Sequence, residues 1–307
     1  MRKINYIFKT TGQILFVIIF LSTSSAHSLD NFNKAERVSD YFSGILFLND
    51  NEYEKSLGYF KKLNGLETSH RNFSIKYLYS LVNSGNLKEA FNFSKKLEKK
   101  NLDSYESHLV LGIYYLKNSN IDLARKHFFK SINKNTEFIL NNYIASSLYN
   151  WSNLTSIHQA KIDLKSINNR FENLKKIQNI FLNCYFMSPK TDSLFIKILS
   201  NQKTDFSRYN YFHANYFASL GKIDNAKKII NSALKLYPRN LLLNQYKYDL
   251  NENKNVLVFD CSKEQHVIAE ILYITANALS SQSIYPLSNF YLNLAKYLNK
   301  DFVSYDT

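Results

Sequence analysis

The sequence lacks the short motifs that carry phosphate binding, hydrolysis or metalloprotease chemistry. It contains no G-x-x-x-x-G-K-[ST], G-x-G-x-x-G, G-x-S-x-G or H-E-x-x-H pattern. The histidines at positions 70, 108, 127, 158, 213 and 266 stand alone, without i, i+4 partners or nearby cysteine ligands. Acids such as Glu89 and Glu98 are dispersed among lysines, so no catalytic pair stands out. We therefore expect no enzyme, no cofactor and no metal site.

Long apolar runs are also absent, apart from one short run near the N-terminus. Residues 14–21 are apolar, follow a basic start at Arg2, Lys3 and Lys9, and precede a small, polar zone with Ser24 and Ala26. This order is typical of a signal peptide, which we place at residues 1–26. The run is far shorter than the ~20 residues that span a bilayer, and no Cys follows it for lipid attachment. A membrane anchor and a mitochondrial transit peptide are the weaker alternatives.

The localisation and the charge follow from that segment. We expect secretion across the inner membrane into the periplasm, with no transmembrane span after cleavage. Residues 1–26 carry three bases and no acids, so removing them takes the net charge from +14 to +11. Such a charge fits an anionic partner. Lysines scattered over solvated helix faces by compositional drift are the stronger explanation, because the Lys-Lys pairs lie in different parts of the chain.

What the chain does have is a regular spacing of small residues. Ser56, Ala90 and Ala124 are 34 residues apart, and Ala226 lies 102 residues further on, which is three such periods. Most have a small residue twelve positions earlier and a bulky one four positions later; these are Gly44, Gly112 and Ala214, and Phe60, Phe128 and Ile230. Small beside large at fixed offsets is what closely packed helical hairpins need.

The pattern resembles the tetratricopeptide repeat (TPR) family, whose unit is a helix–turn–helix of 34 residues. Departures are Leu78 and Ser94 in the second unit, and Trp151, which falls outside the register. The resemblance implies an all-α fold, a right-handed superhelical solenoid of stacked hairpins with a concave face. The C-terminal part looks like longer secreted bacterial TPR proteins.

The same register divides the chain. After the signal peptide we predict three TPR units over 37–138, and degenerate hairpins over 139–206 with helices at 138–150, 155–167, 169–187 and 191–201. A further unit follows at 207–238, then an irregular hairpin and loop at 239–262 and a TPR-like unit at 263–300. Residues 301–307 would begin a truncated further unit, because no polar capping helix follows.

The two cysteines are expected to stay apart. Cys184 falls in the fifth unit and Cys261 beyond the sixth. In a solenoid each unit touches only its neighbours. An oxidising compartment would favour pairing, but the spacing predicts two small, buried, apolar side chains.

Candidate binding residues come from the resemblance. In this family the first helix of each unit lines the groove through its second, fifth, ninth and twelfth positions, which gives Val38, Tyr41, Ile45 and Leu48; Asn72, Ile75, Tyr79 and Val82; Glu106, Leu109, Ile113 and Leu116. The Lys–Asn carboxylate clamp of chaperone-binding members is replaced by Tyr41 and Ile45. Further on, the equivalent positions hold Arg208, Tyr211 and Asn215, and then Tyr273 and Asn277.

These residues predict a groove that binds a protein or peptide. Asn can bond to an extended backbone and Tyr can supply a flat anchor, although Asn is common throughout this chain. The candidates are Tyr41, Ile45, Asn72, Tyr79, Arg208, Tyr211, Asn215, Tyr273 and Asn277. We expect an exported protein–protein interaction scaffold, with a role in cell-envelope assembly as one hypothesis. The alternative is a binder of an anionic polymer, nucleic acid or acidic glycan, through Lys and Tyr.

Overall fold

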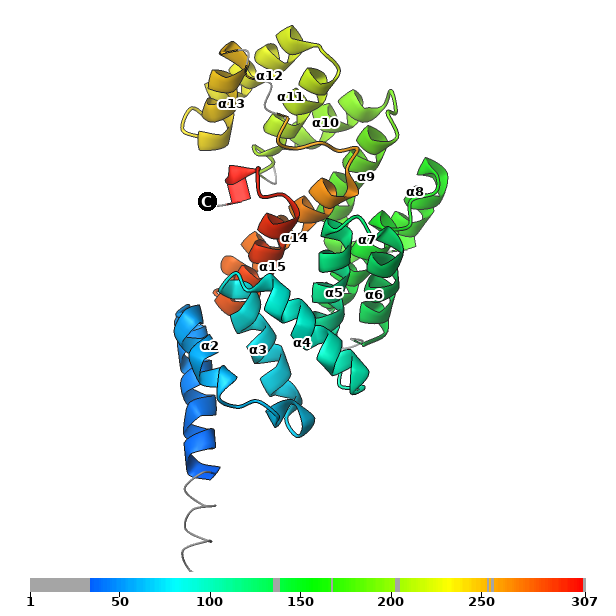
Figure 1. Cartoon of the computed structure of the whole chain (residues 1–307). Helices are drawn as coiled ribbons and strands as arrows, with labels where there is room; N and C mark the ends of the chain where they lie inside the picture. Colours follow the sequence, from blue (N-terminus) through cyan, green and yellow to red (C-terminus); the bar gives the residue numbers. More distant parts are fainter. Residues whose placement is uncertain are drawn as a thin grey trace, which may run out of the picture. The chain divides into compact units, whose positions relative to one another are not determined.

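The chain folds as an array of helices. The computed structural model describes residues 34–134, 139–166, 168–201, 205–252, 254 and 257–305, and the regular structure in these ranges is entirely helical (Figure 1). The predicted signal peptide, residues 1–26, lies outside the described residues. A helical stretch over residues 34–49 comes first. It is followed by α2 (Tyr53–Lys61), α3 (Arg71–Asn83), α4 (Leu87–Lys99), α5 (Tyr105–Lys117), α6 (Ile121–Lys134), α7 (Ile139–Trp151), α8 (Ile157–Ser166), α9 (Glu172–Tyr185), α10 (Thr191–Leu199), α11 (Tyr209–Ser219), α12 (Ile223–Leu236), α13 (Leu241–Asn251), α14 (Glu264–Ser280) and α15 (Tyr285–Leu298), with short 3-10 turns η1 (Leu66–Thr68), η2 (Asn169–Phe171) and η3 (Val303–Tyr305).

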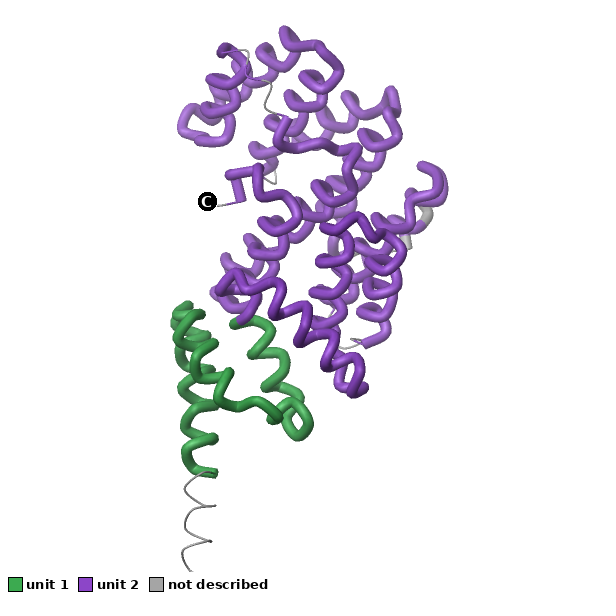
Figure 2. The backbone as a smooth tube through the Cα atoms, in the orientation of Figure 1, with its two compact units in different colours: residues 1–80 green, residues 81–307 purple. Residues whose placement is uncertain are grey.

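Two compact units make up the chain, residues 1–80 and residues 81–307 (Figure 2). The described part of the first unit contains the helical stretch 34–49, α2, η1 and most of α3. In the second unit, each helix from α4 to α12 packs on the next helix along the chain, and α14 packs on α15. This sequential packing is typical of a helical-repeat array. The predicted all-α fold of stacked hairpins is therefore confirmed.

Small residues hold the first hairpin together, as the spacing predicts. The Ser56 hydroxyl is fully buried and donates to the Gly44 carbonyl oxygen at 2.7 Å. A Cβ atom added to Gly44 would lie 2.7 Å from Cδ1 of the buried Phe60 ring, closer than atoms normally approach. The helices can therefore touch only because residue 44 has no side chain.

The same contacts recur in the second unit. A Cβ atom on Gly112 would lie 2.6 Å from Cδ1 of Phe128. In the last hairpin, Ser288 Oγ donates to the Ala276 carbonyl oxygen at 2.7 Å, again across twelve residues. The small–large spacing thus predicts the interior of hairpins far apart in the chain.

The region without strong repeat residues is helical too. Helices α7, α8, α9 and α10 occupy the four positions predicted between 138 and 201. Ser156 begins one of them, because its hydroxyl accepts the N–H of Gln159 at 3.2 Å in the manner of an N-cap. No helix in the described part of the chain combines the length and the apolar composition needed to cross a bilayer.

Candidate partner-binding surface

In the second unit, the chain's own C-terminal hairpin covers the face on which a groove is predicted. Helix α14 packs on α7, and α15 packs on α5 (Figure 1). The predicted groove residues of α5 are accordingly buried: Leu109 and Ile113 are fully inaccessible, and Leu116 is 2% exposed. The C-terminal hairpin therefore does not only extend the row of helices, but folds back onto helices more than 100 residues earlier.

Polar side chains hold the C-terminal hairpin against α5. The hydroxyl groups of Tyr105 on α5 and Tyr291 on α15 lie 3.0 Å apart and are buried. Gln265, at the start of α14, donates from Nε2 to the carbonyl oxygen of Leu116 at 2.9 Å. The C-terminal hairpin buries these polar groups when it covers α5. The contacts supply the hydrogen-bond partners that buried polar groups need.

Arg208, one of the predicted binding residues, is an anchor for the C-terminal hairpin. Its Nε and Nη2 atoms donate to the two carboxylate oxygens of Glu270 at 2.8 and 2.9 Å, and Nη1 donates to Ser304 Oγ at 2.5 Å. The guanidinium carbon lies 4.2 Å from the ring centre of Tyr273. Burial alone lowers the pKa of Arg208, but the carboxylate of Glu270 outweighs it and raises the pKa above its usual range.

Tyr211 and Asn215 also contact the chain itself. Tyr211 is 1% exposed, with its ring centre 4.7 Å from that of Tyr246 and 5.2 Å from that of Phe302. Asn215 donates from Nδ2 to the carbonyl oxygen of Phe259 at 2.8 Å. Phe259 lies in residues 257–260, which have no regular secondary structure. Asn215 is predicted to bond to the backbone of a bound peptide. It does bond to a backbone carbonyl group, but that group belongs to Phe259 of the same chain.

The last two predicted residues lie on α14, the helix that fills the groove. Tyr273 is buried, and its ring centre lies 5.0 Å from that of Tyr305 in η3. Asn277 is exposed. Phe302 and Tyr305 are buried at 2% and 1% exposure, so the chain after α15 packs back into this unit over its described residues.

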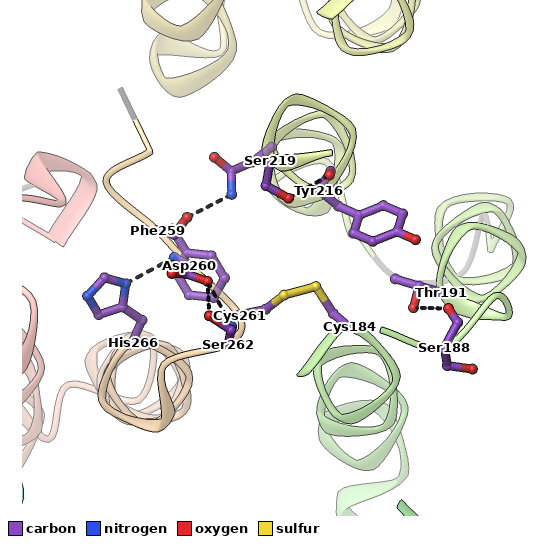
Figure 3. The surroundings of a disulfide bond; sticks show 11 residues. Cys184, Ser188, Thr191, Tyr216, Ser219, Phe259, Asp260, Cys261, Ser262 and His266 are labelled. Carbon is purple, nitrogen blue, oxygen red and sulfur yellow. Dashed lines mark hydrogen bonds between the residues drawn. A yellow bond between two sulfur atoms is a disulfide. The ribbon is translucent and has the colours of Figure 1, made fainter. Parts of the chain in front are cut away.

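The prediction that the two cysteines remain separate is wrong. Cys184 at the end of α9 and Cys261 form a disulfide bond, with their Cα atoms 5.9 Å apart (Figure 3). The prediction assumed that residues 253–262 follow the nearest-neighbour order of the repeats. Instead, the segment 257–262 lies against α9 and α11 and is bonded to the end of the C-terminal hairpin.

Further hydrogen bonds hold the same segment. Asn299, just after α15, donates from Nδ2 to the carbonyl oxygen of Val258 at 2.9 Å. The backbone N–H of Asp260 donates to Nδ1 of His266 at 3.0 Å (Figure 3). The segment 257–262 is therefore tied to α9, α11, α14 and the end of α15.

In the first unit, the first helix presents accessible apolar side chains. Tyr41 and Ile45 are half-buried. Val38, Phe42 and Leu46 are 52%, 63% and 59% exposed. Because they are spaced at i, i+4 and i+8, these three residues form one stripe on the helical stretch 34–49. We call Val38, Phe42 and Leu46 the N-terminal stripe; its spacing is visible in the sequence, but the family register points only to Val38.

The remaining predicted residues of this unit differ in accessibility. Tyr41 packs against His70, with ring centres 4.9 Å apart, and burial raises the pKa of its hydroxyl. Asn72 is exposed, whereas Tyr79 is 8% exposed and belongs to the core. Tyr41, Ile45 and Asn72 are therefore the predicted residues of this unit that a partner can reach.

Comparison with known proteins leaves the family open. No family model and no curated protein matches the chain. Among solved structures, it is similar to a chain of "Structure of Naa15/Naa10 bound to HypK-THB", at 14% sequence identity and a TM-score of 0.32. The match covers 87% of this chain and 42% of that chain, so this chain spans less than half of that protein's length. The fold is an array of helical hairpins, and the comparisons assign no family to the chain.

Proposed function

We propose that this chain is an exported helical-repeat scaffold that binds a helix of a partner protein on its N-terminal stripe. The observation that carries the proposal is the exposure of this stripe. The groove positions of α5 are covered by a helix, α15, whereas Val38, Phe42 and Leu46 on residues 34–49 are exposed. Apolar side chains at helical spacing on one helix are suited to packing against a second helix.

The chemistry of the stripe defines the partner. The stripe has three large apolar side chains at positions i, i+4 and i+8 of one helix. Such a surface fits an amphipathic partner helix whose apolar residues have the same spacing. Tyr41 and Ile45 flank the stripe and add half-buried apolar surface. Burying two such side chains contributes about 1.5–3 kcal/mol each. The N-terminal stripe is therefore where a protein partner gains most binding free energy.

Export is part of the same proposal. The N-terminal sequence has the order of a signal peptide. The bond between Cys184 and Cys261 supports an oxidising compartment, because disulfides persist in the periplasm and outside the cell and are rare in the cytosol. Catalysis is not part of the proposal: neither the sequence motifs nor the described surface suggests it.

A position-specific cross-link tests the partner. A photo-reactive phenylalanine analogue would replace Phe42, Leu46 or, as a control, Tyr248, which is 53% exposed on α13 in the other unit. We expect positions 42 and 46 to cross-link to one helix of one protein, and position 248 not to. Cross-links to a second copy of this chain, or equal yields at all three positions, would contradict the proposal.

Affinity for the purified partner then decides whether the stripe supplies the binding energy. The Phe42→Ser/Leu46→Ser variant should bind it at least about tenfold more weakly, since each tenfold corresponds to about 1.4 kcal/mol. Its melting temperature should stay close to that of the native chain, because both side chains are exposed. Unchanged affinity would rule out the stripe as the binding surface.

A second candidate function, binding of an anionic polymer, is favoured by one cavity. It has a volume of about 470 Å³, lies between α8 and α9, and is lined by His158, Lys161, Leu164, Lys165, Glu172, Lys175, Lys176 and Asn179. Four lysines and one glutamate give it a positive charge. A labelled polyanion should then lose most of its affinity between roughly 50 and 200 mM salt. Lys165→Glu/Lys176→Glu should weaken binding much more than Lys95→Glu/Lys99→Glu, which changes the same charge on α4.

A further inference from the structure

Three consecutive helices bring two histidines and a glutamate together. His108 on α5 and His127 on α6 have fully or almost fully buried side chains, at 0% and 5% exposure, and Glu98 on α4 is 30% exposed. The Nδ1 atoms of the two histidines lie 3.1 Å apart, and Glu98 Oε1 lies 4.0 Å from His127 Nδ1. One ligand atom from each residue lies within 4.8 Å of the others.

The sequence does not suggest this cluster, and the expectation that each histidine stands alone is wrong for this pair. The residues are 19 positions apart and have no i, i+4 relationship. The hairpin register contains a usable signal, however. His108 lies four residues before Gly112, and His127 lies three residues after Ala124. Because these two small residues face each other across an antiparallel hairpin, the histidines must also meet.

The separation of the imidazole nitrogens suits metal binding. Zinc–nitrogen bonds of about 2.0–2.1 Å in a tetrahedral site place two nitrogen ligands about 3.3 Å apart. The observed 3.1 Å is close to that value. Glu98 Oε1 must approach the two nitrogens by no more than about 1.5 Å to complete a third bond of similar length, which its flexible side chain allows.

A neighbouring carboxylate already orients one of the imidazoles. His108 Nε2 lies 2.9 Å from Asp103 Oδ2. A carboxylate only accepts hydrogen bonds, so His108 carries its proton on Nε2 and turns the Nδ1 lone pair towards His127. The same carboxylate–histidine arrangement supports the histidine ligands of many metal sites.

Without a metal, one proton occupies the space between the rings. Because His108 Nδ1 is an acceptor, His127 Nδ1 must donate to it. For a metal ion to bond both nitrogens, His127 must take the other neutral tautomer: its Nδ1 proton is lost to solvent and Nε2 gains one, so both imidazoles stay neutral. The ring of His127 is held for this by stacking on Tyr115, with ring centres 5.5 Å apart and planes 11° apart.

Two lysines also contact the cluster, and one of them competes with a metal. Lys130 Nζ lies 2.6 Å from Glu98 Oε1, and Lys134 Nζ lies 2.7 Å from Asp103 Oδ2. The side chain of Lys130 is 38% exposed, so its ammonium group can move into solvent when a cation takes its place on Glu98. The cluster is thus satisfied by hydrogen bonds in the absence of a metal.

We propose that Glu98, His108 and His127 form a binding site for one divalent transition-metal ion of the zinc class. Two imidazoles and one carboxylate are donors that suit zinc, cobalt or nickel better than calcium or magnesium. A fourth position is left for water or a group from a partner. Bound there, the ion would link α4, α5 and α6, of which α5 packs on both of the others.

The experiment uses the full, untagged chain, freed of metal with a chelator. Co²⁺ is titrated while its visible ligand-field absorption is recorded, and Zn²⁺ then competes for the site. We expect one ion per chain, an absorption typical of tetrahedral coordination, and displacement by Zn²⁺. His127→Ala should abolish the signal, and Asp103→Asn should weaken Zn²⁺ binding about 10–100-fold. His158→Ala, which removes an exposed histidine, should change nothing.

A variant outside the ligand set guards against loss of folding. Lys130→Met should tighten Zn²⁺ binding, because Glu98 is then free of its competitor, whereas Lys99→Met, at the exposed end of α4, should not. The proposal is overturned if saturable binding is absent up to a Zn²⁺ concentration of about 100 μM. It is equally overturned if binding persists in His127→Ala or is the same in Lys130→Met as in the native chain.

Discussion

Arg208, the residue just before α11, and Glu270 on α14 are 62 residues apart in sequence and form a bidentate ion pair. The Glu270 side chain is completely buried, and the Arg208 side chain is 20% exposed. The guanidinium group also lies within 6 Å of the ring centres of Phe212, Tyr273, Phe302 and Tyr305. A planar cation with fixed donors suits such a site, since it can pair with a carboxylate along its edge and contact rings on its faces.

Removing one partner of this pair should destabilise the second unit strongly. Arg208→Met leaves the carboxylate of Glu270 buried without its cation, which costs about 3–5 kcal/mol in comparable cases. The double variant Arg208→Met/Glu270→Leu removes both charges and should recover part of that loss. Urea unfolding of both variants measures the effect. A double variant less stable than Arg208→Met would show that the pair is not what anchors α14.

The local structure of this protein is readable from its sequence, because it depends on contacts between neighbouring helices. Gly44 with Ser56 and Ala276 with Ser288 obey the same twelve-residue offset and make the same hydrogen bond. The helix positions between 138 and 201 follow from the same phase. Such contacts span few residues, so a periodic pattern records them.

The candidate site is less predictable, because it depends on contacts between distant segments. Nothing in the 34-residue period indicates that Arg208 meets Glu270, or that Cys261 reaches Cys184. The available clue is the break in the rhythm after α13, where an apolar segment without a helical partner needs another surface to cover it. The N-terminal stripe could not be predicted for a different reason. Phe42 and Leu46 fall between the positions that the family register assigns to the groove.

Loss of the disulfide bond should lower the free energy of unfolding. The bond closes a segment of 77 residues, and such a cross-link restricts the unfolded chain. Cys184→Ser should cost about 2–5 kcal/mol, and Cys184→Ser/Cys261→Ser should cost no more, because either change removes the same bond. Urea unfolding with and without a reductant checks this. If the reductant leaves the native chain's unfolding midpoint unchanged, the bond is absent from the folded protein.

Two glycines of the first hairpin should respond in opposite ways to alanine. Gly44→Ala forces a methyl group against the buried Phe60 ring and should destabilise the hairpin by about 1–3 kcal/mol. A methyl group on Gly58, in α2, meets no atom within 4 Å, so Gly58→Ala should stabilise by about 0.5–1 kcal/mol through better helix formation. Thermal unfolding of both variants is the measurement. Equal effects would mean that the helices are not in close contact at residue 44.

Stability should fall as the pH drops from about 6.5 to about 4, with His266 as one cause. Burial, reinforced by the charge of Lys263, lowers the pKa of His266 to about 4, against the raising effect of Asp260. The unfolded histidine has a pKa near 6.5 and takes up its proton first. The contribution of His266 is therefore complete above pH 6.5 and is lost through this window. Protonation also removes the acceptor for the Asp260 N–H.

His266→Asn isolates this contribution, because the asparagine oxygen can still accept the Asp260 N–H but does not titrate. The difference in the free energy of unfolding between pH 7.5 and pH 5 should be smaller in this variant than in the native chain. The exposed His158→Asn change serves as the control and should leave that difference as it is in the native chain. Urea unfolding at the two pH values supplies the comparison. If His266→Asn loses as much stability on acidification as the native chain does, another buried group governs the acid response.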